Sequence, residues 1–475
     1  MVLGTDNQNS SGDLITPKSA IKRIAEQSGC RISDLLVLAG KNDPFNCGTE
    51  GDIALAAWFA NLWNKYGMQP GCHIRKLHYA IVVQDEDVPK LDGSPYRNTK
   101  KDAELLEEAS KKARYLGLID PRHLIDRRNP EPYIFAPEFT EPGRPNWSIA
   151  DFYGFTIPSI NPSFYTDLEL PGVDVSGYSY DEGEQPYHLE LWIEKSTMND
   201  EVTPACEEYG INLVTSLGYQ SITSAVGVLS RAGTAAAMGR PVRIFYISDY
   251  DPAGHWMPVA VSRQIQFWRE QFGSDADIKL TPLALTRQQV LEYKLPRKPI
   301  DDADCRKGNF EDRHGEGAVE LDALEALYPG ELDRIIREAA SRYRDEELSD
   351  RLNMAASEAV YEAESAWEQA TESIQIRADD LNRRVQEVAD RFEPKFRKLG
   401  EEFDAEMEDL QEEADELELE LEEFIDSAGY SVVIGLPARP VAEVAPLDES
   451  QWLYDSGRSY IEQLQFFNRH KEGNL

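Results

Sequence analysis

The sequence predicts a multidomain α+β protein with a helical domain, a parallel-sheet α/β domain and a long charged helical arm. Apolar residues recur at helical spacing in the first part. Short apolar runs alternate with helical patterns in the second, and an apolar stripe runs through charged residues in the third. These patterns set the predicted boundaries: a disordered tail at 1–16, the helical domain at 17–136, a linker at 137–187, the α/β domain at 188–330, the acidic helical arm at 331–427 and a C-terminal segment at 428–475.

Three helices followed by a small β ribbon are predicted in the helical domain. Two short helical patterns at 17–39 come first, and the stronger helical patterns lie at 52–66, 73–83 and 101–116. Short β-like segments follow at 119–135. A helix, a tight turn, two further helices and a β ribbon form the outline of a winged helix. We therefore predict a winged-helix DNA-binding domain here.

Three short apolar runs define the sheet of the α/β domain. They lie at 188–194, 211–215 and 242–248, and each ends at a polar turn. Such runs are typical of strands buried on both faces of a parallel sheet. Helical patterns at about 221–231 and 258–272 alternate with them. This alternation predicts a largely parallel sheet covered by helices.

Three carboxylates follow two of these strands. Glu194 closes the first run, and Asp249 and Asp251 follow the third. Ligands of open α/β sheets bind beyond the carboxyl ends of the strands, and clustered carboxylates repel one another unless a cation lies among them. A hard divalent ion such as Mg²⁺ suits oxygen ligands, and its usual substrates are phosphate esters. The alternative is that these side chains only cap turns and helix starts, with Pro252 opening a helix.

The ordered set of motifs resembles a known metal-binding fold. A Glu-Lys pair at 194–195, the segment 209–218 and Asp-x-Asp-Pro-x-Gly at 249–254 are similar to the Toprim domain of topoisomerases, primases and some nucleases. The match spans about 188–324 and looks most like the A subunit of type IIB topoisomerases (topoisomerase VI) and the related meiotic double-strand-break transesterase. The resemblance implies Mg²⁺, or Mn²⁺ in its place, held by Glu194, Asp249 and Asp251, and a DNA phosphate near Lys195.

A second motif lies in the predicted winged helix. That family carries Arg, an acidic residue, Ile or Leu, an aromatic residue and the catalytic Tyr, which Arg75, Leu77 and Tyr79 match and Lys76 and His78 do not. The resemblance implies that Tyr79 is the nucleophile, assisted by Arg75 and by the metal at Glu194. The alternative is that Tyr79 lies at the DNA groove without forming a bond. DNA-backbone contacts are predicted for Arg75, Lys76, Arg127, Arg128 and Lys195.

The chemistry of such a tyrosine is coherent. A phenol has a pKa of about 10, so its nucleophilic phenolate needs nearby positive charge at neutral pH. Attack on a phosphodiester gives a phosphotyrosyl bond that can be resealed without a new energy source. In the related enzymes the tyrosine and the metal come from different protomers, which implies a homodimer. The family also pairs with a GHKL-type ATPase subunit; this chain lacks a Gly-x-x-x-x-Gly-Lys-Ser/Thr loop, so no nucleotide site is expected in it.

Composition sets limits on the class of protein. The net charge is −37, which is unfavourable for DNA binding, but the charge is uneven. Fifteen acidic residues and no Lys or Arg lie at 401–426, whereas 71–150 holds thirteen basic and thirteen acidic residues. Five scattered cysteines argue against a disulfide framework. No signal peptide or membrane span is evident, so a cytoplasmic location and no membrane partner are expected. The family resemblance implies double-stranded DNA as the partner and therefore a nucleoid-associated location.

The acidic arm carries a regular apolar stripe. Between 381 and 424 apolar residues recur about every 3.6 positions, which predicts an amphipathic helix with little supercoil. Pro394 should kink or split it. The arm is therefore predicted to be a helical hairpin or an extended arm, either for docking and dimerisation or packed only on its own domain.

Two other functions remain open on the sequence alone. The first is a Toprim nuclease in which water attacks the phosphate and Tyr79 is dispensable. The second is a non-catalytic DNA-binding or scaffolding subunit whose arm recruits partners.

Overall fold

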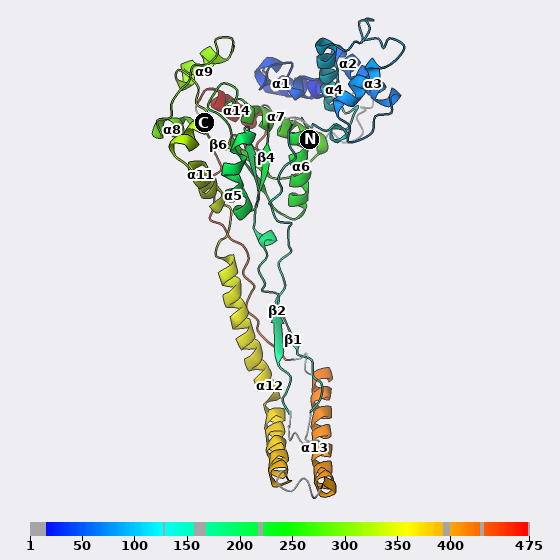
Figure 1. Cartoon of the computed structure of the whole chain (residues 1–475), viewed down its shortest axis with the longest axis vertical. Helices are drawn as coiled ribbons and strands as arrows, with labels where there is room; N and C mark the ends of the chain where they lie inside the picture. Colours follow the sequence, from blue (N-terminus) through cyan, green and yellow to red (C-terminus); the bar gives the residue numbers. More distant parts are fainter. Residues whose placement is uncertain are drawn as a thin grey trace. The chain divides into compact units, whose positions relative to one another are not determined.

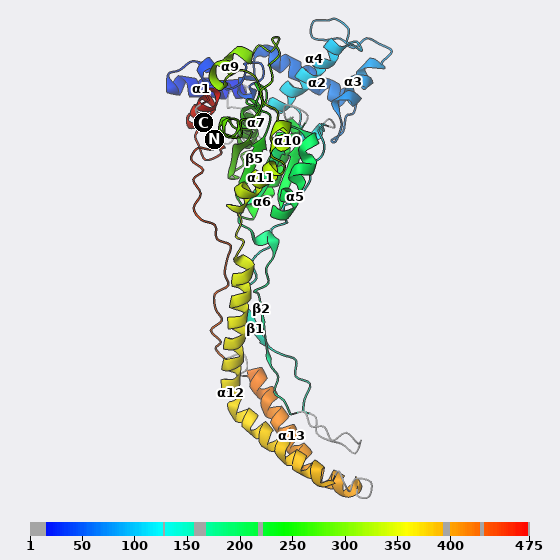
Figure 2. The same cartoon turned by 60° about the vertical axis from the view of Figure 1, so that its left-hand side comes forward.

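The computed structural model describes residues 16–126, 129–155, 168–216, 222–392, 400–427 and 432–473 (Figures 1 and 2). The chain forms two compact units. No helix within the described ranges is both long and apolar enough to cross a membrane. The first unit comprises Met1–Phe139, Gln185–Arg344 and Val444–Leu475, and the second comprises Thr140–Glu184 and Asp345–Glu443.

The first unit begins with the predicted helices. The helices predicted at 52–66, 73–83 and 101–116 start and end within two residues of these bounds. Threonine caps open two of them: Thr49 accepts a hydrogen bond from Asp52 N, and Thr99 from Asp102 N. Their apolar faces meet in one core. The elements are α1 (Pro17–Ser28), η1 (Ile32–Leu35), η2 (Pro44–Asn46), α2 (Glu50–Lys65), α3 (Ile74–Val82), α4 (Lys100–Tyr115) and η3 (Pro121–His123).

The β ribbon predicted at 119–135 is absent from the described residues of that segment. Isolated bridges take its place: Cys72 pairs with Leu124, and Tyr133 pairs with Leu213 in the central sheet. Tyr133 N donates to Leu213 O and Leu213 N to Tyr133 O, both at 2.9 Å. The prolines of this segment remove ladder donors, so it joins an existing sheet edge instead of forming a hairpin. The three helices are confirmed; the winged helix stays a prediction.

A five-stranded sheet forms the centre of the first unit. Its order is β4-β3-β5-β6-β7; the first four strands are parallel and β7 is antiparallel. The three predicted strands are confirmed, whereas β6 and β7 were not predicted. Residues 432–436, whose apolar residues resemble those of a strand, are irregular. The strands are β3 (His188–Ile193), β4 (Ile211–Thr215), β5 (Val242–Ile247), β6 (Ile278–Ala284) and β7 (Tyr454–Asp455).

Helices cover both faces of this sheet. Alternate side chains of a strand point to opposite faces, so Trp192 and Tyr246 join one apolar core while Leu191 and Phe245 join the other. The α/β domain is therefore doubly covered, as the continuous apolar runs predicted. The first core includes residues of α6 (Ile222–Ala237) and α7 (Met257–Phe272); the second includes residues of α5 (Asn199–Tyr209), α8 (Arg287–Glu292), α9 (Lys307–His314), α10 (Asp322–Leu327) and α11 (Glu331–Ser341).

A buried ion pair joins the N-terminal helices to this α/β part. Asp43 and Arg263 are both fully buried at the side chain, and Arg263 Nε lies 3.2 Å from both Asp43 oxygens. The Arg263 guanidinium also lies over the ring of Phe45 and that of Tyr460, the first residue of α14 (Tyr460–Lys471). The helical part, α7 and the C-terminal helix are thus held in a fixed arrangement.

The second unit contains two long helices and a β ribbon. These are α12 (Leu348–Phe392), α13 (Gly400–Ser427), β1 (Asn146–Ile149) and β2 (Val173–Ser176). The segment 137–187 was predicted to be a linker; β1 and β2 instead pair antiparallel within it. Val175 and Tyr178 pack against Ala355 and Ala359 of α12. The small alanine side chains let the ribbon approach the helix closely.

The predicted apolar stripe is buried inside a helical hairpin. Leu381 and Val385 of α12 share one core with Leu410 and Leu417 of α13. α12 ends at Phe392 and α13 begins at Gly400. Pro394, at which the sequence predicts a kink or a split, lies outside the described residues. Much of the stripe is therefore covered by the hairpin itself, with Phe155 and other residues of the β-ribbon segment against it.

Candidate metal and DNA-cleavage site

Glu194 and Asp249 meet at the carboxyl edge of the sheet because they follow adjacent strands. β3 and β5 pair in parallel with Ile193 opposite Ile247, and Glu194 N donates to Ile247 O at 3.1 Å. Asp249 stands two residues beyond the end of β5. The polar edge that the sequence predicted is therefore present.

The loop after β5 holds Asp251 in a tight turn. Asp251 Oδ1 accepts a hydrogen bond from Gly254 N at 2.7 Å, and Ser248 Oγ donates to Gly254 O at 3.0 Å. A Cβ atom on Gly254 would lie 2.1 Å from Asp249 O, so only glycine fits. The spacing Asp-x-Asp-Pro-x-Gly thus has a steric reason. It also means that Asp251 is partly engaged as a turn-forming side chain, as the capping alternative held.

Lys195 lies among carboxylates. Its Nζ is 3.0 Å from Asp249 Oδ2, 2.7 Å from Asp322 Oδ2 and 3.7 Å from Glu320 Oε2. Burial disfavours the ammonium, but the hydrogen bonds to Asp322 and Asp249 outweigh it and raise the pKa of Lys195. Leu321 N donates to Asp249 Oδ1 at 2.7 Å. Lys195 therefore serves first as the counter-ion of Asp249, and a phosphate contact would compete with these bonds.

The surroundings of Glu194 disfavour the charged form of its carboxylate. Burial, together with the negative charges of Asp249 and Asp251, raises the pKa of Glu194 to about 7; the Asp249 N–H and the Lys195 charge act in the opposite direction. Its Oε2 atom is buried and accepts no hydrogen bond from the described residues. Burial likewise raises the pKa of Asp249. A cation beside Glu194 would relieve both the repulsion and the missing contact.

The residues fit a hard divalent ion in their chemistry. Carboxylate oxygens are the donors that Mg²⁺ and Mn²⁺ prefer, and the orphaned Glu194 oxygen offers one. Within the described residues, however, no three His, Cys, Asp or Glu side chains are already arranged as a ligand set. Oxygens of Asp249 and Asp251 already contact Lys195 and accept hydrogen bonds from backbone N–H groups. An ion at Glu194 would have to draw an oxygen from them.

The raised pKa of Glu194 predicts a pH signature in stability. The ordinary pKa of this side chain is 4.5 and the folded value is about 7, so its contribution is present below pH 4.5 and is lost as the pH rises through about 7. We expect the free energy of unfolding of the wild type, relative to Glu194→Gln, to fall over that interval and then stay level. Urea unfolding in EDTA at several pH values measures it. Glu201→Gln, an exposed change on α5, is the control, and its free energy of unfolding should depend on pH as that of the wild type does. A difference in free energy of unfolding between the wild type and Glu194→Gln that stays constant with pH contradicts the account.

The second predicted motif lies on α3. Arg75 and Tyr79 are both exposed, one turn apart, and Tyr79 is 54 % accessible. His78 is buried, with Nδ1 2.7 Å from the Tyr96 hydroxyl and Nε2 3.1 Å from Asn98 Oδ1, so it braces the helix. Lys76 is exposed on the same helix, whereas Arg127 and Arg128 lie outside the described residues.

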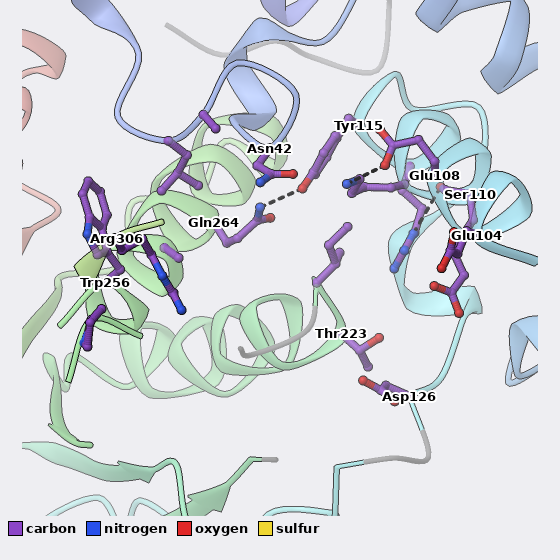
Figure 3. Close-up of a pocket in the computed structure, with 18 of the residues that line it drawn as sticks. Asn42, Glu104, Glu108, Ser110, Tyr115, Asp126, Thr223, Trp256, Gln264 and Arg306 are labelled. Atoms are coloured by element: carbon purple, nitrogen blue, oxygen red, sulfur yellow. Dashed lines mark hydrogen bonds and ion pairs between the residues drawn. The ribbon is translucent and has the colours of Figure 1, made fainter. Parts of the chain in front are cut away.

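Helix α3 and the Asp249–Gly254 loop both line a cavity of about 1040 Å³. His73, Ile74 and Arg75 line it from α3 and its cap, and Pro252 and Trp256 line it from the loop and the start of α7. Figure 3 shows Trp256 and Arg306 on one side and residues of α4 on the other. Arg75 and Pro252 of the Asp249–Gly254 loop therefore line the same cavity, whereas Glu194, Asp249 and Asp251 do not. Tyr79 does not line this cavity.

His255, which follows the Asp249–Gly254 loop, packs against the histidine near the end of α14. The rings of His255 and His470 stack with centroids 4.3 Å apart, and each Nε2 lies within hydrogen-bond distance of the other's carbonyl oxygen, at 3.1 and 3.0 Å. Burial and the neighbouring His470 and His314 lower the pKa of His255 to about 2. Neutral His255 thus packs α14 against the end of the Asp249–Gly254 loop. No sequence pattern marked this long-range contact.

Comparison with known proteins leaves these geometric findings as the basis for a function. No protein-family model matches the sequence, and the search of curated proteins returned no match.

Proposed function

We propose that this protein cleaves DNA in a divalent-metal-dependent reaction and resembles the A subunit of type IIB topoisomerases. The observation that carries the proposal is the pairing of Glu194 and Asp249 at the carboxyl edge of a parallel sheet, with a buried Glu194 oxygen left without a partner. The order of motifs along the chain supports the same reading.

The roles of the residues follow from their charges and positions. Glu194 and Asp249, with Asp251, would hold Mg²⁺, which supplies positive charge to the phosphate under attack. Lys195 keeps Asp249 ionised and oriented through its 3.0 Å contact. Tyr79 is exposed and able to reach a phosphodiester, and Arg75, one helical turn away, would place a positive charge beside the phosphate. The bond formed is phosphate to the Tyr79 oxygen, and the leaving group is a deoxyribose oxygen that takes up a proton.

The proposed active unit is a homodimer. In the related enzymes the tyrosine and the metal come from different protomers, so the resemblance implies that Tyr79 of a second copy would complete the metal site of the first. A GHKL-type ATPase is the partner that the same resemblance suggests. Double-stranded DNA would be the substrate.

Replacement of Tyr79 by Phe tests the nucleophile. We expect supercoiled plasmid incubated with wild type and Mg²⁺, then detergent, to yield broken DNA that enters a gel only after protease treatment, because the protein is covalently attached. Tyr79→Phe should yield neither breaks nor adduct, since only the phenolic oxygen is lost. Retained cleavage without an adduct contradicts transesterification.

A mixing experiment and a matched control sharpen this test. Tyr79→Phe mixed with Glu194→Gln should regain part of the cleavage, because a mixed dimer retains one intact pair of tyrosine and metal site. Tyr153→Phe removes another exposed hydroxyl, 90 % accessible at the residue, and should leave cleavage unchanged. No regain in the mixture contradicts a site shared between protomers.

A hydrolytic nuclease is the second candidate, and the raised pKa of Glu194 favours it. A carboxylate with a pKa of about 7 is suited to take a proton from water near neutral pH. In that case Tyr79→Phe cleaves normally and Glu194→Gln does not. If neither the wild type nor any variant cleaves in Mg²⁺ or Mn²⁺ while DNA binding survives EDTA, the protein is a DNA-binding or scaffolding subunit.

A further inference from the structure

The cavity beside the Asp249–Gly254 loop has the size and lining of a ligand site. Its volume of about 1040 Å³ lies at the upper end of the roughly 300–1,000 Å³ range of ligand pockets. Apolar and aromatic side chains such as Ile74, Ile222 and Phe310 line it. Gln264 Nε2 donates to the Tyr115 hydroxyl at 2.7 Å, which fixes two of the polar groups (Figure 3). Two of its walls, the segment at Asn42 and helix α7, are joined by the buried Asp43–Arg263 pair.

The charge of this lining differs from that of the whole chain. Six basic and four acidic residues line the cavity in a protein of net charge −37. Two of the basic side chains are neutralised by neighbours: Lys111 by Glu108 at 2.7 Å and Arg306 by Asp304 at 2.7 Å. The six are Arg75, Lys111, Arg114, Arg306, Arg313 and Lys471.

Three of the others contact backbone carbonyls instead of carboxylates. Arg114 Nε donates to Ser110 O at 3.3 Å, Arg313 donates to Lys471 O, and Lys471 Nζ donates to Val37 O at 2.6 Å. None of the three has an ion pair within 4.0 Å among the described residues. Burial lowers the pKa of Arg114 to about 10, with Tyr115 and the charge of Asp126 acting in the opposite direction. Burial likewise lowers the pKa of Lys471 to about 8, with the charge of Asp43 acting in the opposite direction.

These cations stand at two ends of the cavity. Arg114 lies next to Ser110 on α4, and Lys471 Nζ lies over the ring of Trp256 at 5.0 Å. In Figure 3, Ser110 and Trp256 are on opposite sides of the cavity. Two cationic ends with apolar groups between them are complementary to a flat ring that carries an anionic group on each side.

We propose that this cavity binds a nucleoside phosphate, with a phosphate at Arg114, a second phosphate toward Arg313 and Lys471, and the base against the apolar wall between them. The expectation that the chain has no nucleotide site rested on the missing phosphate-binding loop; here side chains would do the binding. A free nucleotide and one nucleotide unit of a DNA strand share this chemistry. In the strand form the inference rests on the proposed DNA function.

Calorimetric titration of the full chain in EDTA, which prevents cleavage, tests the site. The probes are thymidine 3′,5′-bisphosphate, thymidine 5′-monophosphate and a short oligothymidylate. We expect the bisphosphate to bind more tightly than the monophosphate. Arg114→Gln and Arg313→Gln should each weaken the bisphosphate about tenfold or more, the effect of losing one charge-assisted contact. Lys101→Gln, an exposed change on α4 outside the cavity, should bind like the wild type.

The outcomes separate the sources and the two proposals. Oligothymidylate binding that exceeds bisphosphate binding and falls in Arg114→Gln identifies a strand; nucleotide binding alone with this sensitivity identifies a free nucleotide. No binding of any probe, or equal binding in both arginine variants and the wild type, overturns the inference. Arg313 is exposed, so its variant remains informative if Arg114→Gln unfolds, which thermal melting reveals. Tyr79→Phe and Glu194→Gln should bind nucleotides normally, so failed cleavage leaves this inference standing.

Discussion

Replacement of Arg231 by Met should destabilise the first unit by about 3–5 kcal/mol, the cost of leaving a buried charge without its partner. Glu190 is fully buried in the middle of β3, and Arg231 contacts both its oxygens, with Nε at 2.6 Å and Nη2 at 2.8 Å. Trp192 Nε1 donates to the same carboxylate at 2.8 Å. Burial alone would raise the pKa of Glu190, but the charge and hydrogen bonds of Arg231 lower it to about 2.

Urea unfolding measures this effect, and pH gives a second signature. In the wild type the ion pair's contribution is present above the ordinary pKa of 4.5 and is lost as the pH falls through about 2. The deficit of Arg231→Met should therefore be largest at neutral pH and shrink in acid, where Glu190 takes up a proton. Arg342→Met, at an exposed arginine paired with Glu338, should stay within about 0.5 kcal/mol of the wild type. A similarly small loss for Arg231→Met contradicts the account.

The sequence predicted those elements whose pattern is local. The strands β3, β4 and β5 are continuous apolar runs, and each begins at its predicted residue and ends at or within one residue of its predicted end. The stripe through Leu381 and Leu410, with Pro394 between its halves, predicted either a helical hairpin or an extended arm, and the two helices pack as a hairpin. Glu194 and Asp249 were placed at one edge because parallel strands share their carboxyl ends.

Features that depend on distant residues escaped prediction. β7 pairs with β6 through Tyr454 and Leu280, far apart in sequence, and the short β7 has no pattern of its own. The Asp43–Arg263 pair joins positions 220 residues apart. Glu190 did carry a signal, because a charged residue inside an apolar strand requires a buried partner, but nothing local identified that partner as Arg231.

The expected β ribbon and the linker were wrong for related reasons. The segment around Tyr133 has β-forming residues between prolines, and it found donors and acceptors at Leu213 of β4 instead of within itself. The segment 137–187 is rich in proline and glycine, yet Trp147 pairs with Val175 in the β ribbon of the second unit. Composition alone does not show which strand edge is free to accept a partner.

Replacement of Asp249 by Asn should abolish the metal-dependent activity. The amide keeps an oxygen that can accept the 2.7 Å hydrogen bond from Leu321 N, so the loop should survive, while the charge that would bind the cation is lost. We expect plasmid cleavage to fall at least about 100-fold, because metal charge stabilisation is worth several kcal/mol in the transition state. Asp322→Asn removes the charge of another carboxylate beside Lys195, 2.7 Å from its Nζ and outside the proposed ligand set, and is the matched control.

Titration of Mg²⁺ into the DNA-free protein at pH 8, followed by calorimetry, tests most directly whether the carboxylates share a cation. The wild type and Asp322→Asn should bind Mg²⁺ with similar affinity. Glu194→Gln and Asp249→Asn should each lower the affinity for Mg²⁺ at least about 100-fold, because even changes to residues that only hydrogen-bond to metal ligands can cost that much. Equal Mg²⁺ binding by all four proteins, or none by the wild type, would contradict a metal site at Glu194 and Asp249.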